Sequence, residues 1–65
     1  MKIIYDKSSD AVYIRLLDLP VNETREDVSG NINIDYAQDN SVIGIEILNA
    51  SAKITKLDTT EPITK

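Results

Sequence analysis

The stretch NINIDYAQDNSVIGIEIL, residues 31–48, alternates apolar and polar side chains on both sides of a short polar segment. The apolar members of this alternation are Ile32, Ile34, Tyr36, Ile43, Ile45 and Ile47. A period of two is typical of a strand with one covered face, and β-branched side chains suit a pleated surface. We therefore predict strands at residues 31–36 and 42–48, joined by a hairpin loop in which Asp39 and Asn40 tolerate positive φ. Gly44 predicts either a bulge or the close approach of another backbone.

The same stretch also has the outline of a calcium-binding loop. The twelve residues from Asp35 to Glu46 carry Asp39 at their fifth position. An EF-hand loop needs an oxygen ligand at position 3, Gly at position 6 and a helix on each side. Ala37 and Asn40 occupy those positions, and the flanking periodicity is that of strands. A polar hairpin is therefore the favoured interpretation.

Three further strands are predicted before this hairpin. Residues 2–5 and 11–17 flank a polar turn at residues 6–10 and predict a first hairpin. Pro20 ends the second of these strands because it cannot donate to a central ladder. The mostly charged residues 21–28 are either a loop or an edge strand, and we favour an edge strand at residues 23–28, where charges discourage unwanted pairing.

After Leu48 the period becomes helical. Asn49 is suited to cap a first turn, and Ala50, Ile54 and Leu57 fall on one helical face. The predicted fold class is α+β, mainly β: an antiparallel meander of four or five strands with a short C-terminal helix packed on or beside the sheet. We expect one domain at residues 1–57 and a tail at residues 58–65. The predicted core consists of Ile3, Tyr5, Val12, Ile14, Leu16, Ile32, Ile34, Tyr36, Ile43, Ile45, Ile47, Ile54 and Leu57.

Composition limits the chemistry of this 65-residue chain, which contains neither Cys nor His. Disulfides, Cys/His zinc sites and a Ser-His-Asp triad are excluded. So small a core supplies only about 3–5 kcal/mol, so we expect a homodimer to add stability. Residues 18–46 carry seven acids against Arg25 within a net charge of −4, which argues against a nucleic-acid partner. No apolar run is long enough for a membrane span or a signal peptide, so we expect a cytoplasmic protein without a membrane partner.

Two groups of residues are candidates for function. Asp35 and Glu46 point outward from adjacent predicted strands, where they would form either an acid–base or metal-binding pair or two solvated surface carboxylates. Tyr13, Arg15 and Leu17 lie opposite the predicted core face, where a dimer contact, a partner or the chain's own tail would cover them. We predict that this face and Ile54 bind a partner, and we expect no cofactor, no metal and no catalytic residue.

The pattern YDKSSDAVYIRL, then ET, then INIDYAQDNSVIGIEILNASAKI resembles the domain of unknown function 2283, a family of small prokaryotic domains. The resemblance covers residues 1–54, and its most specific part is the ending G-I-E-I-L-x-A-S. The matching positions are Tyr5, Asp6, Asp10, Ala11, Tyr13, Ile14, Leu16, Asp35, Tyr36, Gly44, Ile45, Glu46, Ile47, Leu48, Ala50 and Ser51. The chain departs from the family pattern at Ala37 and Asn40.

The resemblance implies a β-rich domain without established catalytic activity, and some relatives lie beside genes for small toxin-like proteins. We therefore expect a non-enzymatic, homodimeric module that binds another protein. The most specific version of this expectation is an antitoxin-like role towards a basic toxin-like partner. The alternatives are a small-ligand or metal-binding domain that uses Asp35 and Glu46, or a purely structural dimer.

Overall fold

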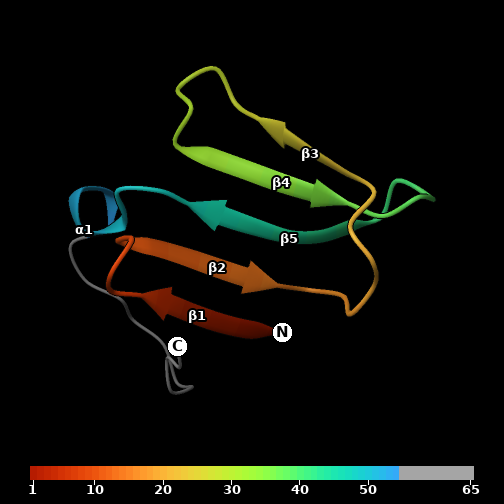
Figure 1. Ribbon diagram of the computed structural model, residues 1–65, viewed down its shortest axis with the longest axis horizontal. Helices are drawn as coiled ribbons and strands as arrows, with labels where there is room; N and C mark the ends of the chain where they lie inside the picture. The colour runs from red at the N-terminus through yellow and green to blue at the C-terminus, as the bar shows by residue number, and fades with distance from the viewer. Residues whose placement is uncertain (55–65) are drawn as a thin grey trace.

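The computed structural model describes residues 1–54, which form five strands and one short helix (Figure 1). The elements are β1 (Lys2–Asp6), β2 (Ala11–Arg15), β3 (Glu23–Glu26), β4 (Ile32–Tyr36), β5 (Val42–Ile47) and α1 (Ala50–Lys53). The predicted fold class is confirmed: the chain is mainly β, with one antiparallel sheet and a short C-terminal helix. All five predicted strands are present, and no strand end lies more than two residues from the expected one. The predicted boundary between residues 57 and 58 lies outside the described residues.

The strand order in the sheet is β1-β2-β5-β4-β3. In the β1–β2 hairpin and in the β3–β4–β5 meander, each strand pairs with the strand that precedes or follows it in the sequence. Residues 16–22 connect them by running past the ends of β5 and β4 to the far edge (Figure 1). The order therefore departs from a sequential meander at one step, and β2 lies beside β5 as in a Greek key.

The register between β4 and β5 shifts by one residue near their hairpin loop. Asp35 lies opposite Gly44 whereas Tyr36 lies opposite Val42, which leaves Ile43 without a counterpart in β4. The bulge that Gly44 predicts is thus present one residue earlier. Asn40, in the loop, has φ +70°, as expected for that turn.

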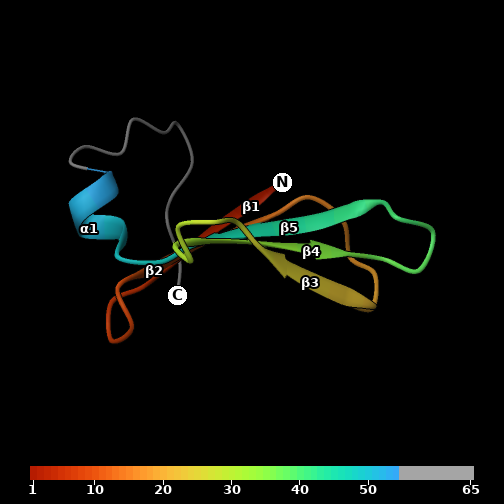
Figure 2. The same ribbon diagram turned by 90° about the horizontal axis from the view of Figure 1, so that it is seen from above.

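The strands form a single layer, and α1 lies at one end of it (Figure 2). The radius of gyration is 12.0 Å, whereas a compact chain of this length has about 10–11 Å. The buried hydrophobic residues among those described are Ala11, Val12, Ala37, Ile43 and Ala50. Three of these are alanines, so the described chain has a small interior. No helix among residues 1–54 is long and apolar enough to cross a bilayer.

The exposure of the side chains shows that part of the predicted core is wrong. Val12 and Ile43 are buried, but Leu16 is 44% exposed and Ile32 36% exposed. Leu16 lies beyond the end of β2, where its amide and that of Leu17 both donate to the Ile43 carbonyl oxygen at 2.7 and 3.1 Å. The alternation of β2 stops there. The other predicted core positions in the described residues are half-buried, because a single layer covers them only from the sides. Leu57 lies outside the described residues.

The helix also differs from its prediction. α1 is a single turn rather than two, and Ile54 follows it in extended conformation (φ −119°). The prediction that Asn49 caps the helix is wrong, because Asn49 has φ +53° and makes no capping hydrogen bond. Its side chain instead donates to Asn31 Oδ1 at 3.1 Å. Asp10 supplies the caps, since its carbonyl oxygen accepts from the Ala50 amide at 2.9 Å and its carboxylate from the Ser51 amide at 3.0 Å.

Candidate functional site

The register divides the side chains of the sheet between two faces, because residues directly opposite each other point the same way. One face, here the apolar face, carries Ile3, Tyr5, Val12, Ile14, Ile32, Ile34, Tyr36, Ile45 and Ile47, with Glu23 and Arg25 on β3. The other, the polar face, carries Lys2, Ile4, Asp6, Ala11, Tyr13, Arg15, Thr24, Glu26, Asn33, Asp35, Gly44 and Glu46.

The apolar side chains of this face lie on four neighbouring strands, β1, β2, β5 and β4, and β3 adds Glu23 and Arg25 without an unpaired charge. Its two ionic residues bind each other, Arg25 Nε lying 2.9 Å from Glu23 Oε2. This contact lowers the pKa of Glu23 and raises that of Arg25. The Arg25 guanidinium also lies 5.0 Å from the centre of the Tyr36 ring. The face is therefore apolar and neutral although the whole chain carries −4.

Tyr13 is the centre of the polar face. Its ring crosses β5 above Gly44, and its hydroxyl donates to Asp35 Oδ2 on β4 at 2.9 Å. A Cβ at residue 44 would overlap that ring, which confirms the predicted close approach at Gly44. The nearest group is the Tyr13 side chain, whereas the prediction was another backbone. Thr24 Oγ1 on β3 donates to the other oxygen of Asp35 at 2.6 Å. Burial, and then the bond to Asp35, raises the pKa of Tyr13.

The two outward carboxylates do not form a facing pair. Asp35 lies opposite Gly44, and Glu46 lies opposite Asn33. Asp35 accepts from Tyr13 and Thr24, whereas Glu46 Oε1 accepts from Asn33 Nδ2 at 3.2 Å. No group of three metal-ligating side chains occurs within residues 1–54. Their geometry is that of two separate hydrogen-bond acceptors: Glu46 links neighbouring strands, and Asp35 links β4 to β3 and, across β5, to β2.

A second hydrogen-bonded group, the Asp10 cluster of Tyr5, Asp10 and Ser51, joins the ends of the domain. Ser51 Oγ donates to Asp10 Oδ2 at 2.7 Å, and Tyr5 donates to Oδ1 at 3.0 Å. The Ser51 hydroxyl, with the Tyr5 hydroxyl and the Ser51 amide, lowers the pKa of Asp10, although burial opposes the shift. The bond to Asp10 raises the pKa of Tyr5. All three residues belong to the pattern quoted above, but their spacing does not predict that they meet.

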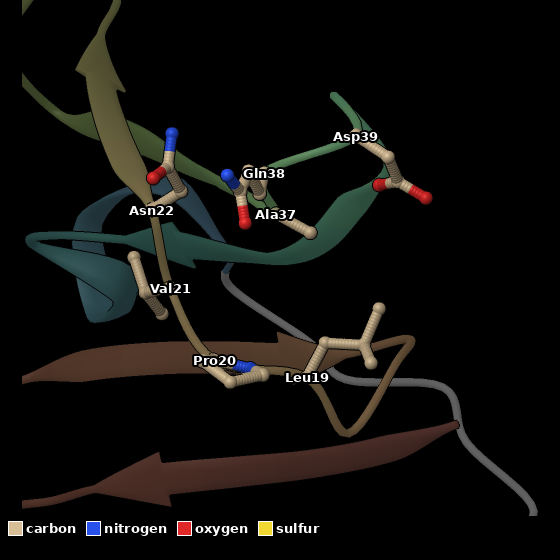
Figure 3. A pocket seen from close by; sticks show the side chains of 7 residues that line it. All are labelled: Leu19, Pro20, Val21, Asn22, Ala37, Gln38 and Asp39. Atoms are coloured by element: carbon tan, nitrogen blue, oxygen red, sulfur yellow. The ribbon is translucent and has the colours of Figure 1, made fainter.

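A shallow hollow of about 300 Å³ lies where residues 16–22 pass the β4–β5 loop (Figure 3). Leu19, Pro20, Val21 and Asn22 line one side, and Ala37, Gln38 and Asp39 line the other. The Asn22 amide donates to the Tyr36 carbonyl oxygen at 2.8 Å and holds the two segments together. The Asp39 carboxylate points away from Asn22 and Gln38 (Figure 3) and accepts from the Ser41 amide. The hollow thus combines exposed apolar side chains with amides rather than with reactive groups.

The four residues predicted to bind a partner do not gather on one surface. Tyr13 and Arg15 are neighbours on the polar face, with the Arg15 guanidinium 5.9 Å from the ring centre. Leu17 lies just beyond the end of β2, 39% exposed. Ile54 follows α1 at the opposite end of the sheet (Figure 1). Binding by any of them stays a prediction, and the larger apolar surface lies on the other face.

A family model described as "Protein of unknown function (DUF2283)" matches residues 2–51. The matched range includes every strand and both residues of the Asp10–Ser51 bond. No curated protein matches the chain, and no solved structure does.

Proposed function

Because the chain belongs to the DUF2283 family, whose function is unknown, we propose its function from the two faces of its sheet. We propose that it is a non-enzymatic module that binds another protein through its apolar face. The observation that carries the proposal is that apolar side chains lie on four neighbouring strands of this face and that most of them are only half-buried, because no second layer of described residues lies over the sheet. Domains bury such a face against a second layer, and a contiguous apolar patch that stays partly accessible marks an interaction site.

The size and flatness of the face favour a protein over a small ligand. Strands of about five residues span about 17 Å, and five strands span about 24 Å. The face therefore has about 400 Å² of projected area, and side-chain relief increases the accessible area above that value. Two such surfaces approach the roughly 1,000 Å² of a specific protein interface. Small ligands instead select enclosed pockets.

Charge indicates the chemistry of the partner. The face itself is neutral, whereas the chain around it is acidic, with Asp18 and Glu26 exposed near its ends. A partner with an apolar patch bordered by Lys and Arg complements both features and is steered towards them. The most specific candidate for this partner is a basic toxin-like protein, and the module would then act as its antitoxin.

A non-enzymatic role agrees with the side-chain chemistry. The chain contains no His or Cys, so imidazole and thiol catalysis are impossible. Asp35 and Glu46 bind separate donors instead of sharing a proton or facing a reactive group. The lowered carboxyl pKa values at Asp10, Asp27 and Asp39 each have a neighbouring serine hydroxyl as their largest cause.

The test is co-expression with the product of the adjacent gene, followed by calorimetry and light scattering of the purified pair. Ile32→Ser should weaken the complex by about tenfold, since about 1.5–3 kcal/mol accompanies full burial of such a side chain and Ile32 is partly covered already. Val28→Ser is the matched control, because Val28 is a fully exposed aliphatic residue of the β3–β4 turn. Equal binding by the two variants would rule out the apolar face. Absence of any complex would rule out the antitoxin-like form.

A further inference from the structure

β1 is an apolar edge of the sheet. It lies at the end of the strand order and pairs with β2 over its whole length without a register shift. Between Lys2 and Asp6 it carries only Ile3, Ile4 and Tyr5, with no proline, glycine or charge. A regular apolar edge presents backbone amides and carbonyls that readily add another strand, unless charges or bulges prevent it.

The β1 sequence is complementary to itself in the antiparallel direction. When two β1 strands are centred on Ile4, Lys2 of each copy lies opposite Asp6 of the other, and Ile3 lies opposite Tyr5. Opposite charges stabilise such cross-strand pairs and like charges destabilise them. We propose that two copies of this chain join through their β1 edges about a twofold axis, forming one continuous ten-stranded antiparallel sheet.

The faces of the sheet agree with this pairing. Lys2, Ile4 and Asp6 belong to the polar face, and Ile3 and Tyr5 belong to the apolar face. Directly opposite residues point the same way, so the apolar faces of the two copies become one surface. Asp6 also accepts from the Ser8 amide and hydroxyl at 3.0 and 2.7 Å, and a carboxylate can accept several hydrogen bonds at once.

The other edge of the sheet opposes the same arrangement. β3 has the sequence Glu23-Thr24-Arg25-Glu26, and all four residues are exposed. Antiparallel self-pairing of β3 would place Glu23 against Glu26 at both ends, and Arg25 already binds Glu23. Pairing of β1 with β3 of another copy would be heterologous and would build rings or open fibres instead of a twofold dimer. Charge therefore directs a closed dimer to β1.

The proposal does not depend on the proposed function, because the edge and the apolar face are different surfaces. Ile32→Ser changes the apolar face on β4 and should leave the β1 dimer intact, whereas changes on β1 should abolish the dimer. A failed partner experiment and a failed dimer experiment are thus distinguishable.

Sedimentation equilibrium of the full chain in low salt tests the interface. Lys2→Glu replaces two opposite-charge pairs by two like-charge pairs and should raise the dimer dissociation constant by tenfold or more. Lys7→Glu is the matched control, since it makes the same charge change in the adjacent exposed turn and should have little effect. A monomer at millimolar concentration, large open assemblies, or equal effects of the two substitutions would each overturn the proposal.

A mixture of charge-swapped variants gives a second test. Neither Lys2→Glu nor Asp6→Lys should pair with itself, because each then has like charges at both ends. Mixed together they should form a heterodimer, since the introduced glutamate faces the introduced lysine and the native Lys2 faces the native Asp6. Recovery of dimer only in the mixture supports the interface, and dimer of equal affinity in all three samples refutes it.

Hydrogen exchange of the unmodified chain avoids substitution altogether. In the monomer, the β1 amides that point away from β2 have no strand partner among the described residues and should exchange quickly. In the dimer they should be protected, so their exchange should slow as concentration rises through the dissociation constant, while β3 amides at the other edge remain unchanged. Concentration-dependent protection at β3 instead of β1 would overturn the proposal.

Discussion

Replacement of Gly44 by alanine should nearly unfold the domain. A Cβ at this position would lie 2.5 Å from Tyr13 Cζ and 2.8 Å from the Ile14 carbonyl oxygen. The ring cannot stay above β5, so its hydroxyl loses Asp35, to which it donates at 2.9 Å. Overpacking costs about 1–3 kcal/mol, and loss of this partly exposed hydrogen bond costs about 1 kcal/mol more. The total of about 2–4 kcal/mol is comparable to the whole stability of so small a domain, about 3–5 kcal/mol.

Urea denaturation followed by circular dichroism measures the effect. Tyr13→Phe is the first control: it keeps the ring and should cost only about 1 kcal/mol. The second control is a double-mutant cycle with Tyr13→Ala. If the ring is the main obstacle, Gly44→Ala should cost much less in the Tyr13→Ala background, with a remainder due to the Ile14 carbonyl. An unchanged urea midpoint for Gly44→Ala, or strict additivity of the two substitutions, would refute the reasoning.

Three further outcomes are expected. Asp10→Ala should release α1, because Asp10 supplies both caps; amides 51–54 should then exchange faster in an NMR experiment while Ser8→Ala, in the same turn, leaves them unchanged. In acid, the free energy of unfolding should fall as pH drops through the folded carboxyl pKa values, below about 4. The pKa of Asp10 and that of Asp39 are lowered in the fold, so their contribution to stability is fully present above the unfolded pKa and is lost below it. A melting temperature independent of pH between 5 and 2 would contradict this. In alkali the sign reverses, because the pKa of Tyr13 is raised in the fold: its contribution to stability is fully present below the unfolded value near 10 and disappears as pH rises through the folded value. Ultraviolet titration of Tyr13→Phe should therefore lack one of the phenols that ionise above the ordinary tyrosine range.

The sequence was most informative where pairing is local. The alternation on either side of residues 37–41 predicts β4 and β5 and their hairpin, because each strand pairs with its immediate neighbour in the chain. The adjacency of β2 and β5 has no such local signal. The alternation at Val12 and Ile14 would suit pairing with any strand that has an apolar face. Only the complete sheet determines that their partners are Ile47 and Ile45.

The site was less predictable, since its residues act across strands. Gly44 indicated a close approach, but nothing in the pattern identified Tyr13 as the group above it. Asp10 and Ser51 are 41 residues apart, so a local capping rule assigned the helix cap to Asn49. The alternation did place Tyr13 and Arg15 on a shared face. It also placed most of the isoleucines on the other face, where the assumption of a covered core concealed that no second layer of described residues lies over them.

Residues 16–22 separate two parts of the chain that can assemble in different order. β1 with β2, and β3 with β4 and β5, pair residues close in sequence, whereas β2 and β5 pair residues such as Val12 and Ile47. Closing that long loop costs more entropy than forming either half, so we expect docking of the two halves to limit the folding rate.

The same connection is then a natural point of division. A cut between Leu19 and Pro20 leaves the β1–β2 hairpin in one piece and the β3–β4–β5 meander in the other. Every β-ladder, including that between β2 and β5, can then form again when the two pieces associate. Folding would become a bimolecular reaction whose rate rises with concentration, measurable by mixing the two peptides in a stopped-flow experiment. A cut between Asp39 and Asn40 would instead separate β5 from its hairpin partner β4, and the pieces should recover the sheet far more slowly.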